Sequence, residues 1–262
     1  MALKQSLEKN GLFLFRYRGQ IPVFIFLLGL PFIFFRYYTK IFLVFALMLE
    51  GNVELFFNIL TVVGIMVSFA GLCIRAYTIG TTPRGTSGRN TKEQVANELN
   101  STGMYSMVRH PLYLGNYLMW AGLLIFIGSL PLFIIISLLY WIYYERIMYA
   151  EECFLEKQFG EKYTEWSMTI PPFLPKIGNF VKSNIPFSFK AVLRREYAGF
   201  FATALCFVII DYIRAYGISM VMDYDFEWVR TSLYCLIVAG VITITLRSLK
   251  HYTKVLSDDN RD

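Results

Sequence analysis

The sequence predicts an all-α protein, a polytopic bundle of about six transmembrane helices that includes a tight helical hairpin. Hydrophobic residues make up 56% of the 262 residues and charged residues only 17%, and the mean hydropathy is +0.47. Several apolar runs also approach the roughly 20 residues that a helix needs to cross a bilayer. Together these observations exclude an ordinary soluble domain.

The apolar runs place the spans in order along the chain. We expect them at about residues 21–35, 54–74, 112–128, 130–146, 197–217 and 231–248. The first contains Pro22 and Pro31 and can kink, or it can borrow from the apolar run Phe42–Leu49, which is too short to cross by itself. Only Ser129 separates the third and fourth spans, which predicts the hairpin.

The polar segments before the hairpin have distinct compositions. Residues 1–20 are polar and basic, which favours a helix at the membrane surface. Residues 80–92 are rich in Gly, Thr and Arg, which is typical of a loop. A phosphate-binding loop is excluded there, because Thr86 stands where that loop needs Lys.

The fourth span is expected to continue into a polar helix at Tyr143–Trp166, with an interruption at Gly160. A rigid turn then ends this helix, because prolines follow at positions 171, 172 and 175.

The last two spans look like an appendage behind the basic linker 176–196. Asp211 and Arg214 lie three residues apart near the outer end of the fifth span, on one helix face. A pair at this spacing is expected to neutralise its charges locally.

The distribution of basic residues predicts the orientation of the bundle. With this layout, 21 of the 25 Lys and Arg residues lie on the side that holds both termini and the segments 75–111 and 147–196. By the positive-inside rule, that side is cytoplasmic. The net charge of +6 follows from the same asymmetry. A nucleic-acid partner is not expected, because the basic residues are spread along membrane flanks.

Some of these flanking cations have a second interpretation as contacts to anionic lipid headgroups, namely Lys182, Lys190, Arg194 and Arg195. The four cysteines are scattered at positions 73, 153, 206 and 235, without the spacing of a metal site. We therefore expect no metal centre and read the cysteines as small apolar residues.

Polar chemistry is concentrated at two points on the membrane edge. The first is the run T-G-M-Y-S-M-V-R-H-P-L-Y-L-G at residues 102–115, which contains one of only two histidines in the chain. The second is Glu151-Glu152, at the end of the next apolar run. This arrangement suggests a site where a soluble reagent meets a lipid-like one.

The two motifs, in this order across a hairpin, resemble the superfamily of isoprenylcysteine carboxyl methyltransferases and phospholipid methyltransferases. The first motif has the form T-G-x-Y-x-x-V-R-H-P-x-Y-x-G, and the second, E-E-x-x-L-x-x-x-F-G-x-x-Y, spans residues 151–163. The resemblance covers about residues 55–176. It implies a methyltransferase core there, preceded by an N-terminal segment with the first span (1–54) and followed by a linker with two further spans (177–262).

The resemblance implies that S-adenosylmethionine binds between the cytoplasmic ends of the helices. The positions that match the cofactor-binding residues of the family are Asn97, Glu98, Leu99, Asn100, Tyr105, His110, Pro111, Leu112, Tyr113 and Glu151. Glu151 would accept hydrogen bonds from the polar groups of the cofactor, and a carboxylate suits a cationic ligand.

Each of these residues also has a structural interpretation. Arg109 can be a membrane-flank cation, and His110 can be the N-cap before Pro111 in a first helical turn. Tyr113 can belong to an interfacial aromatic belt. Because neighbouring side chains on a helix point about 100° apart, at most one of the two glutamates should face the site, and we expect Glu151.

One departure from the family pattern affects the acceptor. Prenylcysteine enzymes carry an Arg four residues before the glutamate, where this chain has Ile147, and Arg146 lies one residue earlier. We expect Arg146 to contact an anionic acceptor group, with a snorkelling membrane anchor as the alternative. The G-x-G element of the phospholipid amine branch is not found at residues 115–117.

The sequence thus predicts an integral membrane enzyme, in a bacterial inner membrane or the endoplasmic reticulum, that methylates a lipid-like acceptor. An anionic oxygen is the favoured acceptor, either a lipid phosphate such as that of lipid A or a prenylcysteine carboxylate. The alternatives are a phospholipid amine N-methyltransferase and a non-enzymatic transporter or lipid-binding scaffold. A transporter is less consistent with the chain, because the charges lie at helix ends and no internal repeat is found.

Overall fold

The computed structural model of the chain describes residues 2–39, 53–83, 94–219 and 227–257. The apolar run Phe42–Leu49 and most of the loop 80–92 lie outside the described residues. In the described part, helices make up the fold and no β-strand is present apart from an isolated bridge between Gly103 and Val181. The predicted all-α fold class is confirmed.

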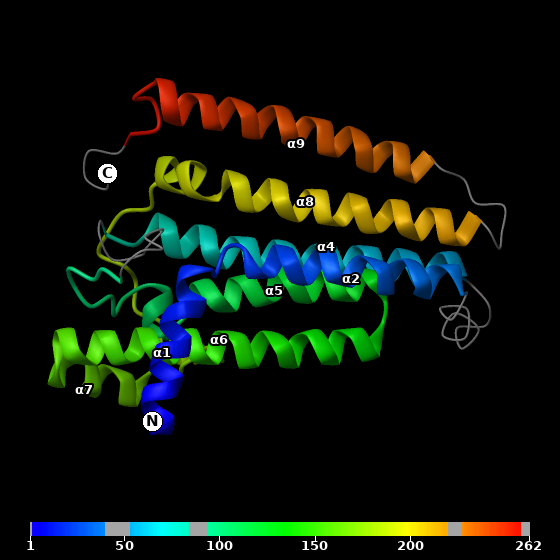
Figure 1. Ribbon diagram of the computed structural model, residues 1–262. Coiled ribbons are helices and arrows are strands. Elements are labelled where there is room, and N and C mark those ends of the chain that lie inside the picture. The colour runs from blue at the N-terminus through cyan, green and yellow to red at the C-terminus, as the bar shows by residue number, and fades with distance from the viewer. Residues whose placement is uncertain (1, 40–52, 84–93, 220–226, 258–262) are drawn as a thin grey trace.

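Figure 1 shows long helices that run side by side, with α1 crossing them. Two short 3₁₀ turns, η1 (Met104–Ser106) and η2 (Ile177–Asn179), lie in the connections. The α-helices are α1 (Leu3–Arg16), α2 (Ile21–Tyr38), α4 (Val53–Gly80), α5 (Pro111–Ile127), α6 (Leu130–Phe159), α7 (Glu161–Thr169), α8 (Phe189–Ser219) and α9 (Glu227–Tyr252).

The predicted spans correspond to these helices. Helices α2, α4, α6, α8 and α9 are long and apolar enough to cross a membrane, and α5 is a shorter apolar helix of 17 residues. The hairpin between α5 and α6 turns at Gly128, which has a positive φ of 70° and caps the end of α5. The predicted polar helix also forms, since α6 runs to Phe159 and α7 resumes after Gly160.

Helices α4 and α5 approach each other closely because glycines meet at their interface. A Cβ added to Gly71 would lie 2.5 Å from the carbonyl oxygen of Gly115, and one added to Gly122 would lie 2.3 Å from that of Gly64. Small residues at such crossings let helix backbones pack tightly in a membrane. This contact fixes α5, whose first turn carries the histidine motif.

The opposite end of the bundle is closed by buried polar side chains. Arg36 of α2 donates to the carbonyl oxygen of Gly128, and the Tyr37 hydroxyl donates to that of Ile127 at 2.9 Å. These bonds satisfy carbonyls that a helix C-terminus leaves unpaired. The predicted pair in α8 is confirmed, with Arg214 Nη2 2.6 Å from Asp211 Oδ1.

Helix α1 packs across α6, as Figure 1 shows, rather than alongside the long helices. Gly11 allows the contact, because a Cβ there would lie 2.1 Å from the carbonyl oxygen of Arg146. Lys157 Nζ of α6 also pairs with Glu8 Oε1 at 2.6 Å. An orientation across the bundle is what a surface-lying helix requires, and α1 braces the part of α6 that leads to the glutamate pair.

Candidate functional site

The histidine motif begins a helix and is held by the proline turn. His110 is the N-cap of α5 and Pro111 occupies its first turn, as predicted. The backbone N–H of Arg109 donates to the carbonyl oxygen of Pro171 at 2.9 Å, and that of His110 donates to Pro172 at 3.2 Å. The turn after α7 therefore anchors the motif by its main chain.

The imidazole of His110 lies between the two carboxylates of α6. Its Nε2 is 2.8 Å from Glu152 Oε1, and its Nδ1 is 3.6 Å from Glu151 Oε2. Both glutamates therefore lie beside His110, although helical geometry favours one, and the choice of Glu151 as the cofactor contact stays a prediction. The two side chains diverge on the helix, but both reach around the ring that inserts between them.

Charge around this histidine is balanced locally. Arg109 Nη1 donates to Glu152 Oε2 at 3.0 Å, so Glu152 holds both an arginine and the histidine. Burial alone would lower the pKa of His110, but its hydrogen bonds and its attraction to Glu151 and Glu152 outweigh burial and raise that pKa. The raised pKa therefore favours the doubly protonated, cationic form of the imidazole.

Tyr113 joins Glu151 to the aromatic core. Its hydroxyl donates to Glu151 Oε1 at 2.7 Å, and its ring lies 4.8 Å from that of Tyr144. The hydroxyl of Tyr140 donates to the carbonyl oxygen of Tyr113 at 2.8 Å. We call Arg109, His110, Tyr113, Glu151 and Glu152 the histidine–glutamate cluster.

Of the other predicted residues, Leu112 lies in the first turn of α5 and the rest lie in the preceding loop. Asn97 and Glu98 are exposed, while Leu99 and Asn100 are half-buried, at the start of the described segment that leads into η1. Tyr105 lies in η1. Burial, and then the charge of Glu151, raise the pKa of Tyr105, so its hydroxyl stays protonated.

Access differs within the cluster. The His110 side chain is only 5% exposed, whereas the side chains of Glu151 and Glu152 are 24% and 25% exposed. Both carboxylate oxygens of Glu152 are hydrogen-bonded, one to His110 and the other to Arg109. Glu151 has one short hydrogen bond, which it accepts from Tyr113. Glu151 thus keeps the greater capacity to accept a hydrogen bond from a ligand.

Arg146 is not brought to this cluster. Its Nη1 donates to the carbonyl oxygen of Ile142, one turn earlier in its own helix, at 2.9 Å. Ile147, at the position of the family's arginine, is fully buried in the aromatic core. The rotation expected from the sequence is thus present, because α6 is a continuous α-helix from Leu130 to Phe159.

Arg75 lies near the end of α4 and begins the basic segment 75–111. Two other cations of that segment, Arg84 and Arg89, lie outside the described residues. In the structure Glu196 of α8 neutralises Arg75, with contacts of 2.7 and 2.8 Å. Sequence reasoning missed Glu196; its signal is a lone acid beside Arg194-Arg195 at the start of an apolar span.

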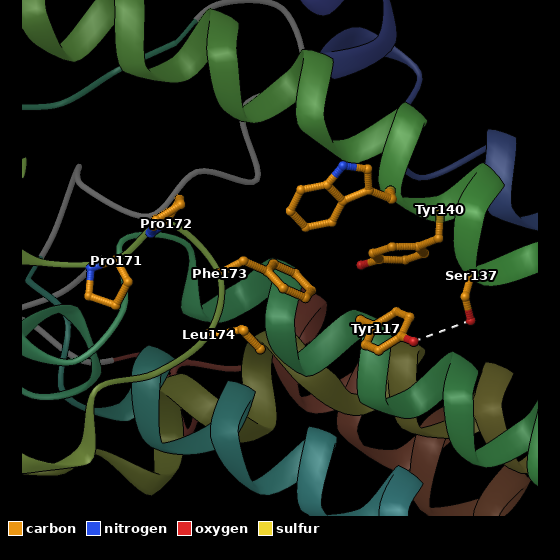
Figure 2. Close-up of a pocket in the computed structure, with 8 residues that line it drawn as sticks. Tyr117, Ser137, Tyr140, Pro171, Pro172, Phe173 and Leu174 are labelled. Carbon is orange, nitrogen blue, oxygen red and sulfur yellow. Dashed lines mark hydrogen bonds between the residues drawn. The ribbon is translucent and has the colours of Figure 1, made fainter. Parts of the chain in front are cut away.

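An apolar cavity of about 490 Å³ lies beside the cluster. Figure 2 shows the rings of Tyr117, Tyr140 and Phe173 converging on it, with the hydroxyl of Tyr117 bonded to Ser137 Oγ at 3.2 Å. Its other lining residues are Trp141, Pro171, Pro172 and Leu174. Three lining residues are hydrogen-bonded to backbone atoms of the cluster. The Tyr140 hydroxyl donates to the carbonyl oxygen of Tyr113, and the carbonyl oxygens of Pro171 and Pro172 accept from the N–H groups of Arg109 and His110.

Among the residues that the structure describes, no group of three or more His, Cys, Asp or Glu side chains is arranged to hold a metal ion. The four cysteines are all free, and they lie apart from one another along the helices.

Comparison with known proteins finds a family match for the segment that carries the histidine–glutamate cluster. Residues 59–162 match the family described as phospholipid methyltransferase. The predicted resemblance is confirmed. The matched segment runs from α4 into α7, so it holds the whole histidine–glutamate cluster and the hairpin between its two motifs.

Three curated relatives each match about a third of the chain. The protein-S-isoprenylcysteine O-methyltransferase of Schizosaccharomyces pombe is 29% identical over 79 residues, which are 30% of this chain and 34% of that protein. The nickel-cobalt-cadmium resistance protein NccN of Alcaligenes xylosoxydans xylosoxydans is 33% identical over 94 residues, 36% of this chain and 41% of that protein. The cobalt-zinc-cadmium resistance protein CzcN of Cupriavidus metallidurans is 33% identical over 81 residues, 31% of this chain and 37% of that protein.

The alignment thus spans less than half the length of each of these relatives. No solved structure gives a significant match. What the comparisons support is a membrane protein whose central segment is of the methyltransferase type.

Proposed function

We propose that this chain is an integral membrane methyltransferase that uses S-adenosylmethionine to methylate an anionic oxygen of a lipid-like acceptor. The observation that carries the proposal is the histidine–glutamate cluster beside an apolar cavity, both within or bordering the matched methyltransferase segment. A polar site that can accept a cation and an apolar compartment are thus joined by hydrogen bonds, as the reaction requires.

The donor set of the cluster fits the cofactor. S-Adenosylmethionine supplies an electrophilic methyl group on a sulfonium cation, together with an ammonium group and ribose hydroxyls. Glu151 and Glu152 offer partly exposed carboxylates, which attract cations and accept hydrogen bonds from ammonium or hydroxyl groups. His110 and Tyr113 orient Glu151, and Arg109 restrains Glu152.

The cavity fits the apolar part of the acceptor. Its aromatic and proline lining offers apolar contact and few polar partners. The Tyr140 hydroxyl, bonded to the backbone of Tyr113, links this wall to the cluster. An acceptor whose chain occupies the cavity would place its headgroup near Glu151, and positioning of that kind is what methyl transfer needs.

An oxygen acceptor suits the surroundings. A phosphate or carboxylate is already anionic at neutral pH, so the chain need not supply a strong base. An amine must first lose a proton, and the bases in the cluster are engaged: His110 is held toward its protonated form and Glu152 pairs with Arg109. The phospholipid amine reaction therefore stays the second candidate.

Arg146 remains our proposed contact for the anionic headgroup. It lies between one and two helical turns before Glu151 on α6, at the end of the bundle that holds the cluster. To bind the acceptor, its guanidinium must exchange the bond to the carbonyl of Ile142 for a bond to the headgroup.

The charge asymmetry supports a cytoplasmic active site. Figure 1 shows the start of α5, helix α7 and both termini toward one end of the bundle. That end carries most of the Lys and Arg residues, which supports a cytoplasmic location for this end and for both termini. The cofactor would then enter from the cytoplasm and the acceptor laterally from the membrane.

The test is equilibrium binding followed by methyl transfer. Isothermal titration of the purified protein in detergent should detect S-adenosylmethionine binding, and the Glu151→Ala variant should bind more weakly. With isotopically labelled methyl donor and lipid extract, mass spectrometry should find label in an anionic lipid. A wild-type protein that binds no cofactor would favour the transporter or scaffold alternative. Label only on amine headgroups would move the assignment to the amine branch.

A further inference from the structure

We propose that Glu196, on a helix outside the matched methyltransferase segment, is a positioning residue that holds the first turn of α5 and therefore the site. The inference rests on the proposed function only for its link to the cofactor. It gives the appended helix α8 a part in the site, which nothing in the family match assigns.

The first step is the bond between α8 and α4. The Arg75 guanidinium meets the Glu196 carboxylate side on, with Nε to Oε2 at 2.8 Å and Nη2 to Oε1 at 2.7 Å. The side chains are 19% and 7% exposed, so water screens this pair weakly. A bidentate contact of this kind fixes the plane of the guanidinium as well as its position.

The second step uses the remaining nitrogen of the arginine. With Nε and Nη2 held by Glu196, Nη1 points at α5 and donates to Asn116 Oδ1 at 2.6 Å. The same nitrogen lies 3.5 Å from the carbonyl oxygen of Leu112. Both acceptors belong to the first two turns of α5, directly after His110.

The third step leads from Asn116 to the cluster. Its Nδ2 lies 3.4 Å from the hydroxyl of Tyr144, whose ring packs 4.8 Å from the ring of Tyr113. Tyr113 in turn donates to Glu151. A contact series therefore runs from the α8 carboxylate to the carboxylate that would meet the cofactor.

Gly115 provides the space for this arrangement. A Cβ at that position would lie 2.5 Å from Cγ of Arg75, so the arginine passes over α5 only because this residue has no side chain. The glycine at the end of the first motif thus allows the α4 arginine to reach the turn that carries the histidine.

Hydrogen exchange tests the inference without any ligand. In the Glu196→Gln variant, one arginine nitrogen faces an amide N–H instead of an oxygen, and the guanidinium loses its fixed plane. We expect the backbone amides of residues 113–116 to exchange about tenfold faster than in the wild type. In Asn116→Leu the ion pair stays but its short side-chain bond to α5 is lost, which leaves only the 3.5 Å contact with the carbonyl oxygen of Leu112, and the same amides should exchange faster.

Asp211→Asn is the matched control. Asp211 is the other buried acid of α8 and pairs with Arg214 at the opposite end of the bundle, so its loss should also lower stability. We expect no change at residues 113–116 in this variant. If Glu196→Gln gave the same exchange pattern as Asp211→Asn, or if Asn116→Leu left these amides unchanged, Glu196 would only tie α8 to the bundle and the inference would be wrong.

Cofactor titration then separates this inference from the proposed function. If the wild type binds S-adenosylmethionine, Glu196→Gln and Asn116→Leu should each weaken binding several-fold, while Asp211→Asn should not. Faster exchange with unchanged affinity would show that the turn moves without affecting the site, which contradicts the positioning role. If the wild type does not bind the cofactor, the proposed function fails and the exchange result still decides whether Glu196 holds the turn.

Discussion

The imidazole Nε2 of His110 lies 2.8 Å from Oε1 of Glu152, although the two residues are 42 positions apart and on different helices. This bond joins the start of α5 to the second half of α6, at the far end of the hairpin from Gly128. Since Arg109 binds the other oxygen of the same carboxylate, Glu152 orients the motif while Glu151 stays available.

This division of roles predicts different behaviour for cofactor binding. His110→Ala and Glu151→Ala should each weaken the affinity for S-adenosylmethionine by about 10- to 100-fold, because a charge-assisted hydrogen bond contributes roughly 1.5–3 kcal/mol. Isothermal titration measures the effect. Glu152→Ala should also weaken binding, through a misplaced His110, so the exposed Glu145 on the same helix is the better control. Unchanged affinity in both His110→Ala and Glu151→Ala would place the cofactor elsewhere.

The protonation of His110 predicts a pH dependence of stability. Its pKa in the folded protein is raised above the ordinary value of 6.5, so its pairing with the glutamates stabilises the fold fully below that pH. The contribution is lost as the pH rises through the higher folded pKa. Thermal unfolding in detergent, between about pH 6 and about pH 9, should show a falling midpoint that His110→Gln lacks. Parallel curves for the two proteins would mean that His110 does not titrate with the fold.

Much of the fold was predictable because hydropathy and length decide a membrane span by themselves. The hairpin, the extension of the fourth span to Phe159 and the break at Gly160 follow from one-dimensional signals. The close approach of Gly71 to Gly115 does not, because a glycine in an apolar run shows no partner until the helices are paired. The path of α1 across α6 was not predictable either, because it depends on a close contact at Gly11 that the sequence does not reveal.

The site was predictable where a motif fixes backbone and chemistry together, as with His110 at the start of a helix before Pro111. Helical geometry alone does not show that Glu152 contacts His110, because three side-chain torsions extend the reach of a glutamate. The Arg75–Glu196 pair joins residues 121 positions apart, and no local pattern links them.

The glycine contact between α4 and α5 predicts a stability effect. Gly122→Ala would place a Cβ 2.3 Å from the carbonyl oxygen of Gly64, so one of the helices must shift. Overpacking of this kind typically costs about 1–3 kcal/mol. The matched control is Gly29→Ala in α2, where an added Cβ meets nothing within 4 Å. Thermal unfolding should show a loss for Gly122→Ala only, and equal midpoints would contradict the close contact.

The orientation of the bundle can be tested by labelling single cysteines in a variant that lacks the four native ones. Two exposed residues mark the two ends of the bundle. Lys254 lies just beyond α9, and Tyr38 is the last residue of α2 at the other end. In sealed vesicles, a membrane-impermeant maleimide should label Lys254→Cys only from the cytoplasmic side and Tyr38→Cys only from the other side. Labelling of both positions from one side would overturn the proposed topology.

Arg146→Lys decides between the two interpretations of Arg146. Lysine keeps the positive charge and the ability to snorkel, but it lacks the planar fork that binds phosphate or carboxylate through two hydrogen bonds. If Arg146 binds the acceptor, the variant should lose most methyl transfer to the native lipid and still bind S-adenosylmethionine like the wild type, since Arg146 does not touch the histidine–glutamate cluster. Arg16→Lys, at an exposed position in the last turn of α1, is the matched control, and it should retain turnover. Near wild-type turnover by Arg146→Lys would instead identify the residue as a membrane anchor, in keeping with its present bond to the carbonyl of Ile142.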